Sequence, residues 1–166
     1  MHPPPRLQSV PERLHLFLLR LYRRLPTWAR RRAVRTIAPS HTVGAICVIE
    51  RSDASILLVR QAYRNHWGLP GGLLQRGEDA PDGARREVFE EVGLPILLIG
   101  EPAVVHEAEP QRVDLVFRAA PLSEDEADGV EPRSPEIVEC RWFAPDALPR
   151  LQHEATCALD ALARRG

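Results

Sequence analysis

The sequence predicts an α/β protein in which a mixed β-sheet is flanked by helices. Short apolar runs rich in β-branched residues recur after residue 40, and they have the length and composition of strands. Two segments have helical spacing, 80–92 between the strand candidates and 153–165 after them. Strands and helices therefore do not alternate strictly, which disfavours a doubly wound parallel sheet. The 166 residues are enough for one compact domain with a buried core.

Charge is distributed unevenly along the chain and indicates two parts. Residues 1–41 hold nine arginines and one acidic residue, whereas the other 125 residues hold 13 arginines and 22 acidic residues. Apolar residues follow a helical spacing between residues 12 and 25, and a second short helical pattern precedes Pro39. We therefore predict a basic, partly helical N-terminal extension over residues 1–38 and a folded domain over residues 39–166.

Two roles are open for this extension. The favoured one is a surface element that covers part of the core or forms the seam of a homodimer, because its apolar residues share one helical face. Contact with nucleic acid or an anionic membrane is the less favoured alternative, since the extension has suitable charge but contains no specific binding motif.

The three cysteines, Cys47, Cys140 and Cys157, are widely separated and form no C-x-x-C pair. This pattern predicts neither a disulfide framework nor a zinc site, and it is typical of a reducing compartment. No apolar run approaches the roughly 18 residues of a membrane-spanning helix. We therefore predict a cytoplasmic protein.

The strand candidates follow one another after residue 41. TVGAICVIE (42–50) and SILLVRQ (55–61) are separated by the turn-like RSDA, and we predict that they pair with each other. Further elements follow in chain order: strands at 96–100, 102–108, 112–120 and 137–143, an acidic loop at 123–135, a turn or short helix at 144–151 and a last helix at 153–165.

The segment 80–92 has signals for both ends of a helix. Asp79 is a plausible N-cap, Pro81 is tolerated in the first turn, and Gly93 stands where a left-handed C-cap is expected. The spacing also predicts an apolar stripe that faces the core, formed by Ala84, Val88 and Val92.

Three glutamates of this helix, Glu87, Glu90 and Glu91, fall within an arc of roughly 100°. Like charges at this spacing repel, and Glu91 also meets the negative end of the helix dipole. Arg86 offsets part of this cost, because it precedes Glu90 by four residues. The arrangement therefore indicates a site for a hard cation such as Mg²⁺, with Mn²⁺ as a substitute.

The stretch GLLQRGEDAPDGARREVFEEVGL, residues 72–94, resembles the Nudix box at every fixed position. That box reads G-x5-E-x7-R-E-U-x-E-E-x-G-U, where U is a bulky aliphatic residue. Gly72 is followed by five residues and Glu78, and seven more residues lead to Arg86 and the run REVFEEVGL. The flanking segments WGLPGG and IVECRWFAPDALP also resemble the family, so the resemblance covers about residues 41–150.

This resemblance implies a Nudix-type α/β/α sandwich and hydrolysis of a diphosphate bond. It implies catalytic roles for Glu90 and Glu91, with Arg86 orienting the acids and Glu78 fixing the geometry of the loop. The metal ligands that it implies are three carboxylates and one backbone carbonyl: Glu87, Glu90, Glu91 and Gly72.

Members of the family differ in the carboxylate that deprotonates the attacking water. Glu90 is the first candidate here, and Glu136 and Glu139, just before Trp142, are the alternatives.

Substrate binding depends on residues outside the box. Tyr63 and Trp67 are candidates for stacking on a base, and Arg60 is a candidate for contact with phosphate, as is Arg64.

The sequence therefore predicts a Mg²⁺-dependent Nudix hydrolase that cleaves a diphosphate bond in a nucleoside diphosphate linked to another moiety. Two alternatives stay open. One is a non-catalytic, nucleotide-sensing Nudix module whose basic extension binds nucleic acid. The other is a pyrophosphohydrolase that acts on the 5′ end of RNA.

Overall fold

The computed structural model describes residues 23–29, 41–109 and 111–165. The chain divides into two units, Met1–Ser40 and His41–Gly166, and each is considered by itself. Most of the predicted extension over residues 1–38 lies outside the described residues; its described part, 23–29, contains short helical turns. Within the described residues, no helix is both long enough and apolar enough to cross a membrane.

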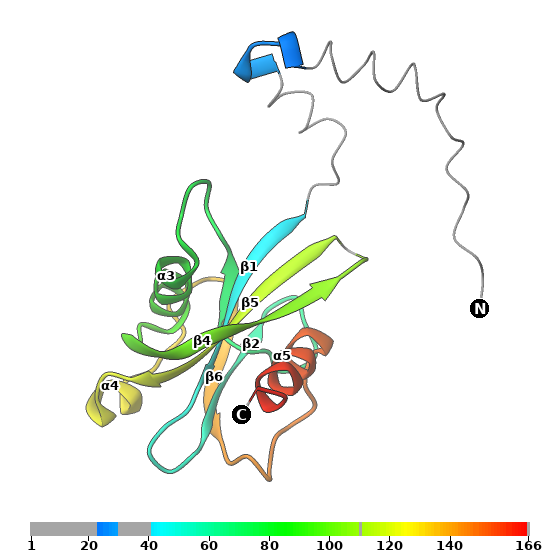
Figure 1. Cartoon of the computed structure of the whole chain (residues 1–166). Helices are drawn as coiled ribbons and strands as arrows, with labels where there is room; N and C mark the ends of the chain where they lie inside the picture. Colours follow the sequence, from blue (N-terminus) through cyan, green and yellow to red (C-terminus); the bar gives the residue numbers. More distant parts are fainter. Residues whose placement is uncertain (1–22, 30–40, 110, 166) are drawn as a thin grey trace, which may run out of the picture. The chain divides into compact units, whose positions relative to one another are not determined.

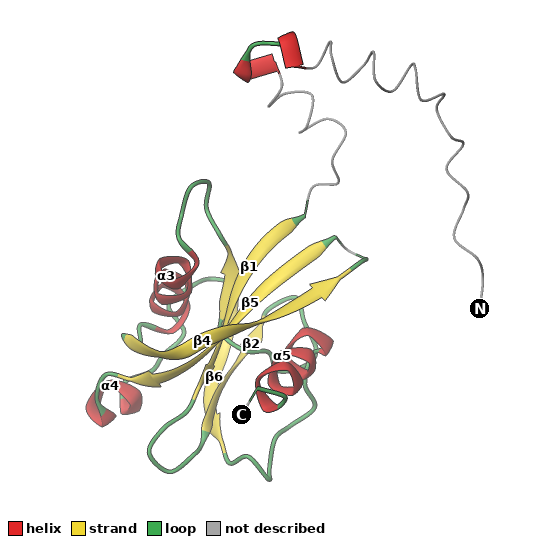
Figure 2. Cartoon of the chain, viewed as in Figure 1, coloured by secondary structure: helices red, strands yellow, loops and turns green. Residues whose placement is uncertain are grey.

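The second unit contains one mixed four-stranded sheet and one two-stranded sheet (Figure 2). In the larger sheet the strand order is β3-β1-β5-β4, and β1 is parallel to β5, whereas the other pairs are antiparallel. The smaller sheet pairs β2 with β6 in antiparallel fashion. The strands are β1 (Thr42–Ile49), β2 (Ile56–Gln61), β3 (Gly71–Leu73), β4 (Ile96–Glu107), β5 (Arg112–Pro121) and β6 (Ile137–Phe143).

The prediction that the first two strands pair with each other was wrong. β1 has β3 on one edge and β5 on the other, so neither edge is free for β2. A single bridge, Glu50 to Ile56, joins the two segments before β2 turns away to pair with β6. The two strands predicted at 96–100 and 102–108 form one strand, β4, with a register irregularity between Ile99 and Ala103.

Two helices cover opposite faces of the large sheet (Figure 1). These are α3 (Ala80–Val92) and α5 (His153–Ala163); a short helix, α4 (Glu124–Asp128), lies within the predicted acidic loop. Side chains of β1 alternate between two apolar clusters, because successive residues of a strand point to opposite faces. One cluster, on the α3 side, contains Ala45, Cys47 and Ile49, and the other, on the α5 side, contains Ile46 and Val48. The predicted α/β/α sandwich is confirmed.

The bounds predicted for the helix at 80–92 are confirmed. The Asp79 side chain accepts a hydrogen bond from the Ala80 N–H, and Gly93 adopts a left-handed conformation with φ of 70°. The predicted apolar stripe of the helix is fully buried. This packing fixes the rotation of α3 about its axis and so determines where its glutamates point.

Candidate active site

Arg86 is the centre of a hydrogen-bond network beside α3. Its guanidinium donates to both oxygens of Glu78, from Nε at 2.7 Å and from Nη2 at 2.8 Å. Its Nη1 donates to Glu87 at 2.8 Å and to Glu90 at 3.0 Å. Glu78 also accepts from the Gln75 N–H at 2.8 Å, and these hydrogen bonds lower the pKa of Glu78 to about 2. Glu78 therefore joins the loop before α3 to the helix itself.

Glu91 is the buried acid of the site, with only 8% of its surface exposed. Its carboxylate accepts from the Gly71 N–H at 2.9 Å, and no described residue forms an ion pair with it. Burial raises the pKa of Glu91 to about 8; the Gly71 hydrogen bond opposes this shift, and Glu87 and Glu136 add to it. A buried carboxylate without a cationic partner is destabilising, so this position favours a bound cation.

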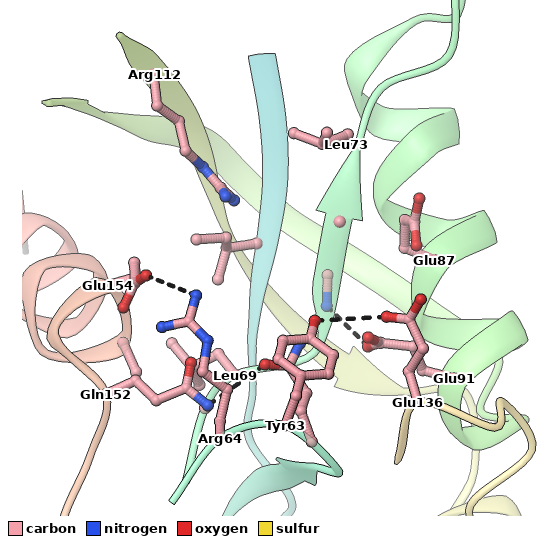
Figure 3. A pocket seen from close by; sticks show the side chains of 16 residues that line it. Tyr63, Arg64, Leu69, Leu73, Glu87, Glu91, Arg112, Glu136, Gln152 and Glu154 are labelled. Carbon is pink, nitrogen blue, oxygen red and sulfur yellow. Dashed lines mark hydrogen bonds and ion pairs between the residues drawn. The ribbon is translucent and has the colours of Figure 1, made fainter. Parts of the chain in front are cut away.

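A cavity of about 420 Å³ lies beside Glu91, with glutamates on one side and, on the other, two arginines that are each paired with a carboxylate (Figure 3). We call Glu87, Glu91 and Glu136 the acidic wall, and Arg64 and Arg112 the basic wall. In Figure 3 the two arginines lie across the cavity from the two α3 glutamates. The volume is in the range of small-molecule binding sites.

The loop before β6 carries Glu136 and is attached to two neighbouring elements. The Arg133 N–H donates to the backbone carbonyl of Glu91 at 2.8 Å, and the Ala62 N–H donates to that of Glu136 at 2.8 Å. The Tyr63 hydroxyl also reaches the Glu136 carboxylate at 3.5 Å. Glu136 is therefore held in place by the end of α3 and by the segment after β2.

The basic wall is supported by a nearly buried acid. Arg112 Nε donates to both oxygens of Asp114, at 2.9 and 2.8 Å, and Asp114 is only 2% exposed. Gly44 makes room for this pair, because a Cβ at that position would collide with the Asp114 carboxylate. Arg64 donates to Glu154 of α5 at 3.3 Å. Both arginines are thus already oriented by carboxylates toward the cavity.

Of the predicted substrate-binding residues, Tyr63 lines the cavity, whereas Arg60 and Trp67 do not. Arg60 donates instead to Glu139, at 3.1 and 2.9 Å. The Trp67 ring packs edge-on against Phe143, with ring centroids 4.9 Å apart. Both residues therefore have structural partners that keep them away from the cavity.

The three carboxylates considered for proton abstraction lie in different surroundings. Glu136 lines the cavity. The Glu90 side chain is 56% exposed and is bound by Arg86, outside the lining of the cavity. Glu139 is paired with Arg60 and Arg141 on the two-stranded sheet.

The cavity is also lined by Arg112, Gln152 and Glu154, none of which was predicted from the sequence. Arg112 opens β5, and the parallel pairing with β1 brings it beside Thr42. A weak signal was present, because an arginine two residues before an acid lies on the same face of a strand. For Gln152 and Glu154 the sequence contained no such signal, since only the packing of α5 brings them to the cavity.

The donors around Glu91 fit a hard cation. Glu87 lies directly against β3: a Cβ added to Gly72 would be 2.5 Å from the Glu87 carboxylate. Among the described residues, the box carboxylates do not form a group of three with oxygens within 4.8 Å of one another, and two of them, Glu87 and Glu90, are bound by Arg86. Mg²⁺ binds through one or two carboxylates and completes its shell with water and phosphate oxygens. The buried, unneutralised Glu91 with Glu87 beside the same cavity meets that requirement.

Comparisons with known proteins agree with this picture. The family model of the NUDIX domain matches residues 40–162. A MutT-like protein from Streptomyces ambofaciens is 35% identical over 129 residues, which are 76% of this chain and 80% of the relative. A crystal structure of a NUDIX hydrolase from Nitrosomonas europaea gives a TM-score of 0.64 at 27% identity and covers 73% of this chain and 69% of that chain. A crystal structure of an ADP-ribose pyrophosphatase from Streptococcus suis gives a TM-score of 0.61 at 27% identity and covers 75% of this chain and 88% of that chain.

The sandwich fold and the glutamate-rich helix beside a charged cavity define a hydrolase of phosphate anhydrides. The family match spans most of the chain, so the chain belongs to the Nudix family and is a Nudix pyrophosphohydrolase. It is therefore an enzyme, and the alternative of a non-catalytic nucleotide sensor is not supported.

Proposed function

We propose that the protein is a Mg²⁺-dependent hydrolase that cleaves the diphosphate bond of a nucleoside diphosphate linked to another moiety. The observation that carries this proposal is that one cavity has glutamates on one wall and two arginine side chains on the other. An acidic wall suits a divalent cation, and a basic wall suits the phosphates of a substrate.

The acidic wall and its neighbours would hold the metal. Glu87 and Glu91, with Glu90 and the Gly72 carbonyl, would supply the oxygen ligands for Mg²⁺, and Mn²⁺ would substitute. Bound there, the ion would neutralise diphosphate oxygens and lower the pKa of a bound water. Arg86 keeps Glu87 and Glu90 oriented, and Glu78 fixes Arg86 to the loop.

Glu136 is the residue that we assign to proton abstraction, in preference to Glu90, because it lines the cavity and Glu90 does not. Its carboxylate takes a proton from the attacking water while the water oxygen forms a bond to phosphorus. The bridging phosphorus–oxygen bond breaks, and the two products each keep one phosphate.

The remaining cavity residues bind the rest of the substrate. Arg64 and Arg112 pair with phosphate oxygens, and Tyr63, which is 64% exposed at the rim, stacks on a base. An ADP-ribose pyrophosphatase among the similar structures is consistent with a substrate in which a diphosphate joins a nucleoside to a second group. The cytoplasmic location, the homodimer and the roles of the N-terminal extension stay predictions.

The test is a hydrolysis screen of the full chain with Mg²⁺. The panel contains ADP-ribose, nucleotide sugars, NADH, dinucleoside polyphosphates, nucleoside triphosphates with their oxidised forms, and RNA with a 5′-triphosphate. We expect kcat/KM for a nucleoside diphosphate derivative to exceed that for triphosphates by at least about tenfold, and EDTA to abolish turnover. A preference for triphosphates with release of pyrophosphate would refute the proposed substrate class, and a preference for the RNA would support the alternative that acts on RNA 5′ ends.

A further inference from the structure

A second group of metal-ligand side chains lies outside the acidic wall. Among the described residues, Glu107, His153 and Cys157 each place one ligand atom within 4.8 Å of the ligand atoms of the other two. Glu107 is the last residue of β4, and the other two are on the first turns of α5. Oxygen, nitrogen and sulfur donors together are typical of a zinc site rather than a magnesium site.

Two of the three separations match those between ligands of one ion. Cys157 Sγ lies 3.5 Å from His153 Nε2 and 3.9 Å from its Nδ1, and Glu107 Oε1 lies 3.7 Å from Nε2, so the exposed His153 ring would turn to point Nε2 at a shared ion. Ligands at about 2.0 to 2.3 Å from a tetrahedral ion are about 3.3 to 3.8 Å apart. His153 and Cys157 are four residues apart on one helix, so they stand on the same face and approach the ion together.

An independent observation concerns the third ligand. Glu107 Oε1 is buried and has no hydrogen-bond partner within the described structure, and its side chain is only 16% exposed. A buried carboxylate oxygen without a donor is costly. A protonated His153 would relieve part of this cost, but the 3.7 Å separation is too long for a hydrogen bond. A cation that bridges the two atoms would satisfy the oxygen fully.

We propose that Glu107, His153 and Cys157 form a zinc site with three protein ligands and a fourth position filled by water. Zinc binding would release the Cys157 proton, because the thiolate is the ligand. The cysteine pattern predicts no zinc site, because the spacing His-x3-Cys is not a C-x-x-C pair and the glutamate lies 46 positions before the histidine.

The position of this group suggests a structural role for the ion. Glu107 is paired with Arg112 across the β4–β5 ladder, and Arg112 is part of the basic wall. His153 directly precedes Glu154, which holds Arg64. Zinc would therefore fasten the start of α5 to the β4–β5 hairpin, and both elements carry cavity residues.

The experiment is a titration of the metal-free full chain with Co²⁺ and Zn²⁺ in excess Mg²⁺, which is added to fill the site proposed at the acidic wall. We expect a thiolate-to-cobalt charge-transfer band that Zn²⁺ displaces, and a rise in the unfolding temperature with Zn²⁺. Cys157→Ser should remove the band, and Glu107→Gln and His153→Ala should each weaken Zn²⁺ binding at least about tenfold. Cys140→Ser and His66→Ala are the matched controls; neither residue belongs to the Glu107 group, so both variants should behave as the unchanged protein.

A cobalt band that survives in Cys157→Ser and disappears in Cys140→Ser would overturn the proposal. So would Zn²⁺ affinity that is equal in all five variants, because zinc would then bind elsewhere. If Glu107→Gln and His153→Ala change the unfolding temperature equally with and without Zn²⁺, and no band forms, the pair is an ordinary ion pair and the zinc site does not exist. None of these outcomes depends on hydrolysis, so the test is independent of the proposed function.

Discussion

The two walls of the cavity are built differently. The acidic wall comes from two turns of α3 and from a loop that is hydrogen-bonded to the end of that helix. The basic wall is assembled from separate elements, with Arg64 after β2 and Arg112 on β5, and it is supported by Glu154 on α5. The difference indicates that the glutamates proposed to bind the metal are encoded within one helix, whereas Glu136 and the groups proposed to bind the substrate depend on the tertiary fold.

The strongest test of this contrast is Glu91→Gln in the acidic wall. We expect kcat to fall about 10³-fold, because a charged ligand beside the reacting phosphate is lost. Without metal, the raised pKa of Glu91 keeps most of this carboxyl protonated at neutral pH. Glutamine resembles that neutral form and still accepts from the Gly71 N–H, so the unfolding temperature in EDTA should change little. Steady-state kinetics and thermal unfolding in EDTA measure both effects. Glu101→Gln, at an exposed position of β4, is the control. Near-normal turnover by Glu91→Gln would show that Glu91 is not a metal ligand.

Glu136→Gln should have the next largest effect. The loss of a general base lowers kcat by about 10²-fold, and KM should change little. Glu139→Gln provides a matched control three residues away, because Glu139 is paired with Arg60 outside the cavity. If the Glu139 variant loses activity and the Glu136 variant keeps it, our choice of base is incorrect. A loss in Glu90→Gln that persists at saturating Mg²⁺, while Glu136→Gln keeps its activity, would restore Glu90 as the base.

On the basic wall, Arg64→Ala should raise KM about tenfold while kcat changes less than about threefold, because one charge-assisted hydrogen bond to phosphate is lost. Arg118→Ala is the control, since Arg118 is similarly exposed and does not line the cavity. Initial rates over a range of substrate concentrations separate the two parameters. A fall in kcat without a change in KM would mean that Arg64 acts in bond cleavage, and the contrast between the walls would fail.

The smallest effect is expected at Tyr63. Tyr63→Ala should raise KM about fivefold, because stacking on a base is lost. The expected increase is small because the ring is largely exposed, which weakens the stacking. Tyr63→Phe keeps the ring and loses only a long hydrogen bond to Glu136, so its KM should equal that of the unchanged enzyme. Equal defects in both variants would assign the effect to the hydroxyl and its contact with Glu136.

The sequence was informative about α3, where one short segment contains both the signals for the helix and the candidate site residues. The caps at Asp79 and Gly93 and the buried stripe of α3 follow from local preferences, so the helix and the direction of its glutamates could be predicted. The ion pair between Arg86 and Glu90 follows from the same helical spacing.

The sequence was less informative where distant segments meet. Strand pairing depends on which edges are free, so two adjacent apolar runs suggested a hairpin that the occupied edges of β1 prevent. Trp67 resembled a base-stacking residue by its position, but its contact with Phe143 depends on a strand 76 residues later. Arg112 was missed because its role arises from the parallel pairing of β5 with β1.

Glu91 has a consequence for the dynamics of the enzyme. Its side chain accepts from the Gly71 N–H and its backbone carbonyl accepts from the Arg133 N–H, so one residue joins β3, α3 and the loop that carries Glu136. Local opening of the end of α3 should expose both amides to solvent together. Hydrogen exchange at Gly71 and Arg133 would then slow in parallel when a divalent ion binds, and these two amides would report the occupancy of the site in the absence of substrate.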